Sequence, residues 1–416
     1  MRVLVFEQWT GGHHFHYLKY LLPRLSEIAD EVIVTLTARA CESDEFRAQL
    51  AGACELPRVR IEASVPAADP ALRGGERLRV LRHLQDAIRA TRPDHVLVPT
   101  ADAPTLAMAA LGTIGLGRLP RGAESEAALH CGYGPAIACL KHRLKESAYR
   151  TAFAVADWDR MHFVNFACYE LARRRGLRWA HRARLVPDPV PVVRRLERVQ
   201  ARRMLGIPED GRYLGLLGIL DARKAIPELL EAFRAARLGR SDRLLLAGRM
   251  QPSLLALVRE RHADLLREQR LVLIDRYLHE HELLSGYCAL DVACITYRDF
   301  PGVASLLLKA LAAGRPVIAH DFGWARAVVK RFGVGHTCRV RDPGAFAATL
   351  ERGLNESGDY LETPAVQRLL EFHTVDNFAE SILERIRARA GKPAAVPPRT
   401  WEWVLQALRP ELRMAY

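Results

Sequence analysis

Two adjacent basic residues, Arg223 and Lys224, lie in a polar turn of the sequence GLLGILDARKAIPELLEAF. The apolar run before the turn is typical of a β-strand, and the segment that begins near Pro227 has helical spacing. A diphosphate at this turn would meet both cations and the positive end of the helix dipole. The turn is therefore a candidate anion site, although on spacing alone a solvated turn explains the same residues equally well.

A second candidate anion site lies in RDFPGVASLLLKALAAGRPVIAH, residues 298–320. Gly302 and Ser305 stand at the predicted start of a helix, where unpaired backbone N–H groups suit a phosphate. Lys309 stands a little over one turn into this helix, and helical side chains lean toward the N-terminus, so its ammonium could reach an anion there. The alternatives are an ordinary capped core helix and a Lys309 that extends to solvent.

A pair of glycines, Gly11 and Gly12, follows the first predicted strand in EQWTGGHHFHYLKYLL. Paired glycines let the backbone approach an anion at a helix start, but a plain strand-to-helix turn uses glycine equally well. His13, His14 and His16 could suggest a metal site. No acid or cysteine stands at matching spacing, so we interpret them as surface or cleft imidazoles.

His130 ends a short apolar run, Ala128–His130, in the first half of the chain. The end of such a run is the carboxyl end of a predicted parallel strand, the side on which open α/β sheets bind ligands. We therefore predict that His130 lines a ligand site. The alternative is a core histidine held by ordinary hydrogen bonds.

The second half of the chain alternates short apolar runs with segments of helical spacing. The predicted strands are Tyr213–Leu217, Leu244–Ala247, Leu271–Ile274, Asp291–Tyr297, Pro316–His320 and Thr337–Val340. The predicted helices are Pro227–Arg237, Ser253–Glu268, Glu280–Ala289, Ala304–Ala313, Trp324–Phe332 and Pro343–Leu354. This alternation predicts a parallel, doubly wound sheet.

The first half repeats the alternation less clearly. Its predicted strands are Val3–Phe6, Val32–Leu36, His95–Pro99, Ala128–His130, His162–Val164 and Arg184–Val186. A helix at Phe15–Leu25 has one apolar face. We predict two Rossmann-like domains that face each other across a cleft, joined at the proline-rich segment 186–193.

The composition limits the class of protein. A length of 416 residues favours two domains, and the net charge is +13. Basic residues concentrate at 173–203, which we interpret as a solvated surface, with an anionic membrane or acidic substrate as the alternative partner. No segment resembles a nucleic-acid module, so we expect no nucleic-acid partner.

Cysteine spacing and hydropathy indicate the compartment. The 8 cysteines form no CxxC pair, which favours a reducing compartment. No apolar signal region begins the sequence, and no apolar run is long enough to span a bilayer. We expect a cytoplasmic protein, with peripheral contact to the inner membrane face as the alternative.

Taken together, these motifs resemble those of the retaining nucleotide-sugar glycosyltransferases of the GT-B fold, the group of bacterial mannosyltransferases and glycogen-synthase relatives. The resemblance covers about residues 1–390 and is strongest from Tyr213 to Leu354. Gly11 and Gly12 match the glycine pair after the first strand of that family. The segment ALHCG places His130 where the family has a histidine beside the reacting sugar.

The segment GILDARKA resembles the family motif G-R-L-x-x-x-K-G. It keeps Gly218 and Lys224, but Ile219 stands where the family has an arginine for the diphosphate. The resemblance implies that Arg223 substitutes for that arginine.

The segment ALAAGRPV aligns with the end of a family motif that contains two glutamates separated by seven residues. In this chain Pro301 and Lys309 stand at the two acidic positions. Asp299 is the nearest carboxylate that could reach a donor sugar instead. Gly302 and Ser305 still supply the helix start that faces a phosphate.

The resemblance implies transfer of a sugar from a nucleoside diphosphate sugar to a glycan, lipid or small-molecule acceptor, with retention at the anomeric carbon. We expect no metal and no cofactor other than this co-substrate. The alternatives are a noncatalytic nucleotide- or glycan-binding relative that lost the acids, and a nucleotide-sugar epimerase. The implied catalytic residues are His130 and Asp299, and the implied donor and phosphate residues are Gly11, Gly12, Gly218, Arg223, Lys224, Gly302, Ser305 and Lys309.

The predicted domain organisation follows the same resemblance. Residues 1–190 form an acceptor domain and residues 191–374 a nucleotide-sugar domain. A helix at 375–390 crosses back to the first domain, because no further strand follows for it to cover. Residues 391–416 form a linker and a short amphipathic helix.

Overall fold

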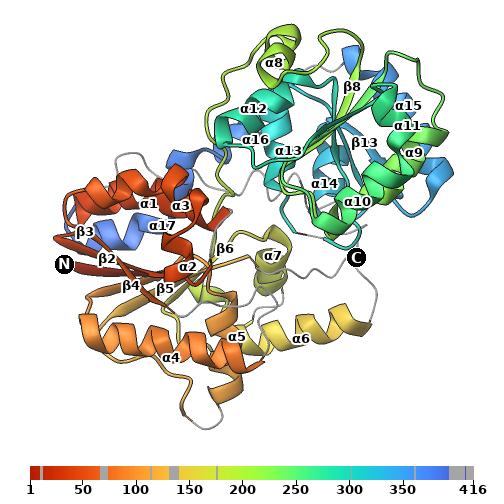
Figure 1. Ribbon diagram of the computed structural model, residues 1–416. Helices are drawn as coiled ribbons and strands as arrows, with labels where there is room; N and C mark the ends of the chain where they lie inside the picture. The colour runs from red at the N-terminus through yellow and green to blue at the C-terminus, as the bar shows by residue number, and fades with distance from the viewer. Residues whose placement is uncertain are drawn as a thin grey trace. The chain divides into compact units, whose positions relative to one another are not determined.

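The computed structural model describes residues 1–9, 13–65, 74–112, 115–130, 140–174, 177–300, 302–359, 362–392 and 408. The chain divides into two compact units (Figure 1). The N-terminal unit contains Met1–Pro189 and the described residues 375–392, and the C-terminal unit contains Val190–Thr374 and Leu408. Apart from residues 391, 392 and 408, the linker and short helix predicted at 391–416 lie outside the described residues.

The N-terminal unit contains a parallel sheet of order β3-β2-β1-β4-β5-β6-β7. Its strands are β1 (Arg2–Phe6), β2 (Glu31–Thr37), β3 (Val59–Val65), β4 (His95–Val98), β5 (Glu124–Leu129), β6 (Arg160–Phe163) and β7 (Ala183–Leu185). The sequence analysis missed the edge strand β3, because Arg60 and Glu62 interrupt its apolar pattern. The strand order reverses between β1 and β4, which are direct neighbours.

Helices cover both faces of this sheet. One face packs against α1 (His13–Ile28) and α17 (Val375–Arg389), and the other against α4 (Gly74–Thr91), α5 (Asp102–Gly112) and α6 (Leu140–Val155). The remaining helices are α2 (Ala38–Cys41), α3 (Asp44–Gln49), α7 (Phe166–Arg174), and the 3-10 helices η1 (Ala51–Glu55) and η2 (Ala180–Arg182).

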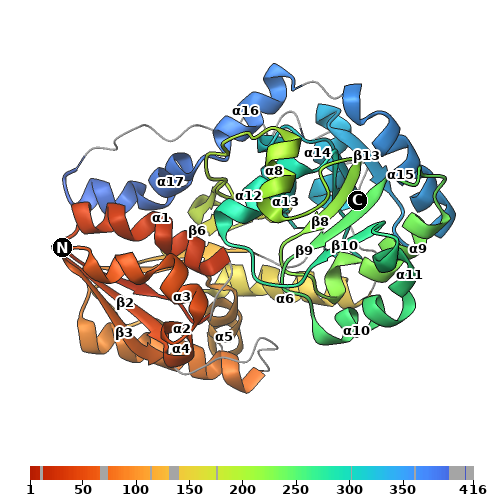
Figure 2. The same ribbon diagram turned by 45° about the horizontal axis from the view of Figure 1, so that its top comes forward.

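The helix α17 lies beside α1 in both ribbon views (Figures 1 and 2). Phe378 of α17 packs against Tyr17 of α1, with their ring centroids 4.6 Å apart. Phe378, Ile382 and Ile386 are fully buried in the same apolar cluster as β1 and β2. The last long helix is therefore part of the N-terminal core, although the whole C-terminal unit precedes it in the sequence.

The C-terminal unit contains a parallel sheet of order β10-β9-β8-β11-β12-β13, with the order reversed between β8 and β11. Its strands are β8 (Tyr213–Leu217), β9 (Arg243–Ala247), β10 (Leu271–Ile274), β11 (Val292–Ile295), β12 (Val317–His320) and β13 (Gly335–Cys338). The predicted parallel, doubly wound architecture is confirmed. The predicted strand Thr337–Val340 was placed two residues too late, because the pairing with β12 begins at Gly335.

Helices also flank this second sheet. They are α8 (Arg198–Leu205), α9 (Ile226–Ala235), α10 (Pro252–Arg261), α11 (Ala263–Arg267), α12 (Glu280–Ala289), α13 (Ser305–Ala312), α14 (Gly323–Phe332), α15 (Pro343–Asn355) and α16 (Pro364–Phe372), with the 3-10 helices η3 (Ala222–Lys224) and η4 (Ser357–Asp359). The single helix predicted at Ser253–Glu268 is two helices, because the backbone leaves the helical region at His262 (φ −125°, ψ 25°).

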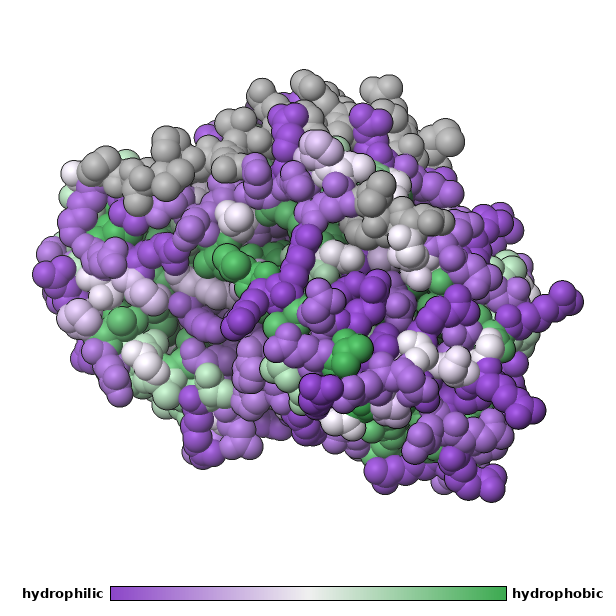
Figure 3. Space-filling model, turned by 90° about the horizontal axis from the view of Figure 1, so that it is seen from above, coloured by the Kyte–Doolittle hydropathy of each residue, from purple (hydrophilic) through white to green (hydrophobic). Residues whose placement is uncertain are grey.

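Figure 3 shows one face of the molecule coloured by hydropathy. The face shown in Figure 3 is largely hydrophilic, and its apolar areas are small and separate. No helix in the described part of the chain is long and apolar enough to cross a membrane. The large apolar side chains exposed to solvent are scattered in sequence, at Leu116, Leu144, Val155, Val192, Val199, Met204 and Ile219.

Candidate functional site

Lys224 is a buried cation next to the carboxyl end of β8. Its side-chain nitrogen Nζ donates a hydrogen bond to the carbonyl of Leu217 at 2.6 Å. Burial lowers the pKa of Lys224 from 10.5 to about 7, and the nearby Asp221 only partly offsets this effect. An ammonium has three N–H donors, and the carbonyl of Leu217 is the acceptor that the described part of the chain gives it, so an anion at this place would supply further acceptors.

Gly218 leaves room for this lysine. Its φ is +91°, which favours glycine, and a Cβ at this position would lie 3.3 Å from Nζ of Lys224. The same Cβ would lie 3.5 Å from Cδ1 of Leu306, in the first turn of α13. The turn after β8 and the start of α13, two separate candidate anion sites in the sequence, are therefore neighbours.

The start of α13 has no side-chain cap. Ala304 is the N-cap residue and provides no capping hydrogen bond. Ser305 is the first helical residue, and Gly302 packs so closely on Phe300 that a Cβ would lie 2.9 Å from its ring. Backbone N–H groups at such a helix start are suited to an anion.

Lys309 is buried and does not extend to solvent, with only 6% of its surface accessible. It stands one helical turn after Ser305, as the sequence analysis expected. The alternative of a solvated Lys309 is therefore wrong. Pro301, at the position of the other missing acid, lies outside the described residues.

Arg223 and Asp299 are both engaged in exposed ion pairs. Two nitrogens of the Arg223 guanidinium donate to Asp221 Oδ2, at 3.0 and 2.7 Å. Asp299 accepts two hydrogen bonds from Arg341, at 3.1 and 3.0 Å. A ligand that used Arg223 or Asp299 would have to compete with these partners.

The sequence analysis missed two polar residues at the same edge of the sheet. Glu228, in the first turn of α9, pairs with Arg298 at 2.7 Å. His320, at the end of β12, is fully buried, and its Nδ1 lies 3.1 Å from the carbonyl of Ile295. Burial lowers the pKa of His320 to about 4, so the ring is neutral. In the sequence, the position of Glu228 at a helix start and that of His320 at the end of a strand are the features that could have identified them.

In the N-terminal unit, His130 directly follows β5 and is half-buried. Its backbone N–H donates to Asp102 Oδ2 at 2.9 Å, and its ring nitrogen Nε2 lies 3.4 Å from the carbonyl of Pro99. The ring stacks on Tyr17 with centroids 5.3 Å apart. His130 thus stands at the carboxyl edge of the sheet, held by residues from α5, α1 and the end of β4.

A second polar group lies at the same edge, and the sequence analysis did not identify it. Glu7 directly follows β1 and is fully buried. Its Oε2 accepts a hydrogen bond from the Thr100 hydroxyl at 2.7 Å, and the same hydroxyl oxygen lies 2.8 Å from His14 Nδ1. Burial raises the pKa of Glu7 to about 7. Its place directly after a predicted apolar strand is the feature of the sequence that could have identified Glu7 as a candidate site residue.

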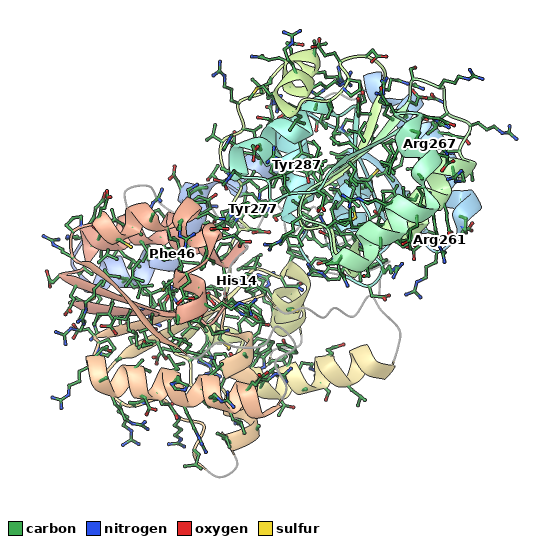
Figure 4. The ribbon with its side chains drawn as sticks, viewed as in Figure 1. His14, Phe46, Arg261, Arg267, Tyr277 and Tyr287 are labelled. Carbon is green, nitrogen blue, oxygen red and sulfur yellow. The ribbon has the colours of Figure 1, made fainter. Side chains whose placement is uncertain are left out.

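His14, which we interpret from the sequence as a surface or cleft imidazole, is mostly buried, so the surface interpretation is wrong. It lies at the beginning of α1 (Figure 4) and has 13% of its side chain accessible. Its ring stacks on Trp9 with centroids 5.4 Å apart and lies 6.1 Å from the ring of His130. Gly11 and Gly12, which join β1 to α1, lie outside the described residues.

These observations define the class of protein. Two units, each a parallel sheet with helices on both faces, constitute the GT-B fold. The Anabaena protein HepE, in complex with UDP and glucose, is similar with a TM-score of 0.65 and 17% identity, over 93% of this chain and 100% of that chain. Sucrose-phosphate synthase from Thermosynechococcus elongatus is similar with a TM-score of 0.63 and 15% identity, over 100% of this chain and 98% of that chain.

Sequence comparison with protein families finds a match within the C-terminal unit. Residues 211–356 match the family described as Glycosyl transferases group 1. An uncharacterized glycosyltransferase of Methanocaldococcus jannaschii is 26% identical over 191 residues, or 44% of this chain and 47% of that protein. The match therefore spans about half the length of that relative. The family match contains Gly218, Lys224 and the whole of α13.

Proposed function

We propose that this protein transfers a sugar from a nucleoside diphosphate sugar to an acceptor hydroxyl. The observation that carries the proposal is the buried Lys224 beside the start of α13, in the unit that matches the glycosyltransferase family. HepE is similar in fold and is described in complex with UDP and with UDP-glucose. We therefore propose a uridine diphosphate sugar as the donor.

The proposed chemistry follows from the charge that develops on the leaving group. When the bond between the anomeric carbon and the phosphate oxygen breaks, the diphosphate gains negative charge. The Lys224 ammonium and the N–H groups at the start of α13 would stabilise that charge, and such preorganised donors are a major source of catalysis. We propose that these groups serve without a metal, and that the sugar is transferred with retention, as the family resemblance implies.

The acceptor side of the reaction is proposed for the N-terminal unit. His130 stands at the carboxyl edge of that sheet, where open α/β sheets bind ligands. We propose that it contacts the sugar or the acceptor. The acceptor itself is a hydroxyl of a glycan, a lipid or a small molecule.

One observation favours a second candidate, a binding protein without transferase activity. Lys309 is buried in α13 at a position where the family has an acid. A lysine cannot accept hydrogen bonds from sugar or ribose hydroxyls as a glutamate does. A protein that binds a nucleoside diphosphate or a glycan without transferring sugar would retain Lys224 and the same fold.

A single set of measurements separates these candidates. We expect UDP and one or more UDP-sugars to raise the melting temperature, because a ligand that binds the native state stabilises it by mass action. We then expect slow release of UDP from that sugar in the absence of an acceptor. Stabilisation without any release of UDP would favour the binding protein. If no nucleotide and no nucleotide sugar stabilises the protein, the transferase and a nucleotide-binding protein are both contradicted, and only a glycan-binding protein is left.

A further inference from the structure

A chain of hydrogen bonds at the carboxyl edge of the N-terminal sheet links a carboxyl group, a hydroxyl group and an imidazole. Glu7 follows β1, Thr100 follows β4, and His14 lies in the first turn of α1. The two distances are 2.7 Å, from Thr100 Oγ1 to Glu7 Oε2, and 2.8 Å, from His14 Nδ1 to Thr100 Oγ1. Three separate segments of the chain therefore meet at the hydroxyl of Thr100. This residue is buried, with 4% of its surface accessible.

The direction of these hydrogen bonds depends on the charge of Glu7. The other oxygen, Oε1, accepts the backbone N–H of Trp9 at 3.0 Å. When Glu7 is ionised, the Thr100 hydroxyl donates to Oε2, so its oxygen must accept from Nδ1–H of His14. A neutral imidazole carries one proton, so in this state its Nε2 is the basic nitrogen.

When Glu7 is protonated, the direction reverses. Since Oε1 already accepts a backbone N–H, the proton resides on Oε2, facing Thr100. The hydroxyl then accepts from Glu7 and donates to Nδ1 of His14. The imidazole proton moves to Nε2, which can no longer accept a proton from a ligand. The carboxyl group thus sets which ring nitrogen of His14 is basic.

The charged and titratable groups around this chain have defined partners. Glu7 Oε2 lies 4.0 Å from His14 Nδ1, and the His14 ring lies 6.1 Å from that of His130 on the adjoining strand end. Asp102 of α5 accepts the backbone N–H of His130. Tyr17 of α1 donates to Asp188 at 3.2 Å, and burial with this carboxylate keeps the pKa of Tyr17 above its ordinary value.

We propose that His14 is a catalytic base that accepts the proton of the acceptor hydroxyl, and that Thr100 and Glu7 are positioning residues that hold it in the required tautomer. This proposal rests on the proposed function. The acceptor oxygen forms its bond to the anomeric carbon on the face from which the diphosphate departs, as the proposed retention requires, while its proton passes to Nε2 of His14. The bond from that carbon to the phosphate oxygen breaks, and its electron pair leaves with the nucleoside diphosphate.

The first test examines the tautomer directly and does not depend on turnover. Nitrogen-15 NMR of the imidazoles distinguishes Nδ1–H from Nε2–H, and the signal of His14 is assigned as the one absent from His14→Gln. We expect Nδ1–H above pH 8 and a change toward Nε2–H as the pH falls through 7, because burial raises the pKa of Glu7 to about 7. In Glu7→Gln the amide N–H faces Thr100 and donates to it, so we expect Nε2–H across the whole range.

The second test measures transfer as a function of pH. We expect His14→Gln to lower kcat about 10²- to 10⁴-fold, the usual contribution of a general base, with UDP affinity unchanged. Glu7→Gln should lower kcat at pH 8 and abolish the rise in rate through pH 7. Thr100→Val should behave like Glu7→Gln, whereas Thr100→Ser should restore most of the rate. His83→Gln, on α4 at the opposite face of the sheet, is the matched control.

Either test can overturn the proposal. A wild-type tautomer and pH response in Glu7→Gln would show that the carboxyl group does not direct His14. A kcat within about threefold of the parent in folded His14→Gln would exclude a catalytic base, because general bases contribute far more. If the parent binds UDP but transfers no sugar to any acceptor, the proposed function fails, and the catalytic role of His14 fails with it. In that case the tautomer measurement still shows whether Glu7 and Thr100 determine which ring nitrogen of His14 carries the proton.

Discussion

At the scale of single residues, two buried groups with shifted pKa values mark the two candidate sites. Burial lowers the pKa of Lys224 to about 7 and raises that of Glu7 to about 7. In both cases burial disfavours the charged form. A diphosphate next to Lys224 would restore its charge, and the Glu7 carboxyl changes charge near neutral pH. Perturbed groups of this kind concentrate at functional sites.

Replacing Lys224 tests the donor site. We expect Lys224→Met to weaken UDP binding about 10- to 150-fold, since a hydrogen bond to a charged group contributes about 1.5–3 kcal/mol. Isothermal titration calorimetry measures the change, and Lys330→Met is the matched control, because Lys330 is exposed on α14. Equal affinity in Lys224→Met and the parent would remove the phosphate site from this turn.

The pKa of Lys224 also predicts that UDP binding takes up protons. Above pH 7 the ammonium of the free protein loses its proton, and a bound diphosphate favours its return. Affinity should therefore fall as the pH rises from 7 to 9. Calorimetry at pH 8 in two buffers of different ionisation enthalpy gives the number of protons taken up. If the parent takes up no protons on binding UDP, or if the uptake persists in Lys224→Met, Lys224 is not the group that gains the proton.

The same buried ammonium should destabilise the ligand-free protein. Its folded pKa, about 7, lies below the ordinary value of 10.5, so the unfolded chain binds more protons between these two values. The contribution of Lys224 to stability therefore rises with pH through this window, and its destabilising effect is complete below pH 7. We expect Lys224→Met to raise the melting temperature more at pH 6 than at pH 9. An equal or opposite difference would contradict the burial argument.

Replacing Lys309 tests whether its positive charge contributes to the binding of the donor diphosphate. We expect folded Lys309→Met to bind UDP more weakly than the parent, because a cation near the start of α13 would be lost. Lys309→Glu should bind still more weakly, since its carboxylate would repel the diphosphate. Calorimetry and circular dichroism together separate affinity from folding. Parental affinity in both variants would exclude a donor role, and tighter binding by Lys309→Glu would favour the binding protein without transferase activity.

At the scale of elements, the strand ends and helix starts position every candidate residue. In the C-terminal unit the turn after β8 and the start of α13 meet at Gly218. In the N-terminal unit the ends of β1, β4 and β5 bring Glu7, Thr100 and His130 to one edge. In both units these strands flank the reversal of strand order. A parallel sheet opens a crevice at such a reversal, which explains why polar residues gather there.

The helix α17 should be essential to the N-terminal unit. Phe378 is fully buried between α1 and the sheet, so we expect Phe378→Ala to destabilise the protein by about 3–5 kcal/mol, as large core truncations do. Hydrogen exchange should show the loss of protection in β1, β2 and α1. Glu384→Ala, at an exposed position of the same helix, is the control. Unchanged protection in these strands would contradict a core role for α17.

At the scale of the whole molecule, the two units have separate cores. The C-terminal unit buries its own apolar cluster from β8 to α15, and Val190–Thr374 is one continuous segment. The N-terminal unit is built from two long segments far apart in the sequence, whereas Leu408 is the described part of the C-terminal unit that lies outside 190–374. The chain carries a net charge of +13, which favours association with anionic partners over long distances.

The segment 190–374 holds the apolar core of the C-terminal unit, which predicts that it folds alone. We expect a fragment of residues 190–374 to unfold cooperatively and to bind UDP, with the binding lost in the same fragment carrying Lys224→Met. Residues 1–189 expressed alone should not form a stable unit, because the apolar face that α17 covers would be exposed. Calorimetric unfolding of both fragments checks this. A fragment 190–374 that folds but does not bind UDP would place necessary donor contacts outside this unit.

The sequence by itself determined the architecture, because alternation of apolar strands and amphipathic helices is a local signal that survives without tertiary information. It placed β8, β10 and α12 at their observed bounds, and it missed β3, whose charged edge-strand residues weaken that signal. It also singled out Lys224, Gly218 and the start of α13 as a candidate anion site, because a short turn and a helix start are local features; their role in binding an anion stays a prediction.

Only the tertiary structure decided which residues from distant segments meet. Glu7, His14 and Thr100 are separated by up to 93 positions, and no spacing rule relates them. Their hydrogen bonds exist because parallel strands end at one edge of the sheet. Burial also depends on the complete fold, so the structure alone could show that Lys309 is enclosed and that Asp299 is paired with Arg341. The pKa values of Lys224 and Glu7 follow from the same burial, which a sequence does not contain.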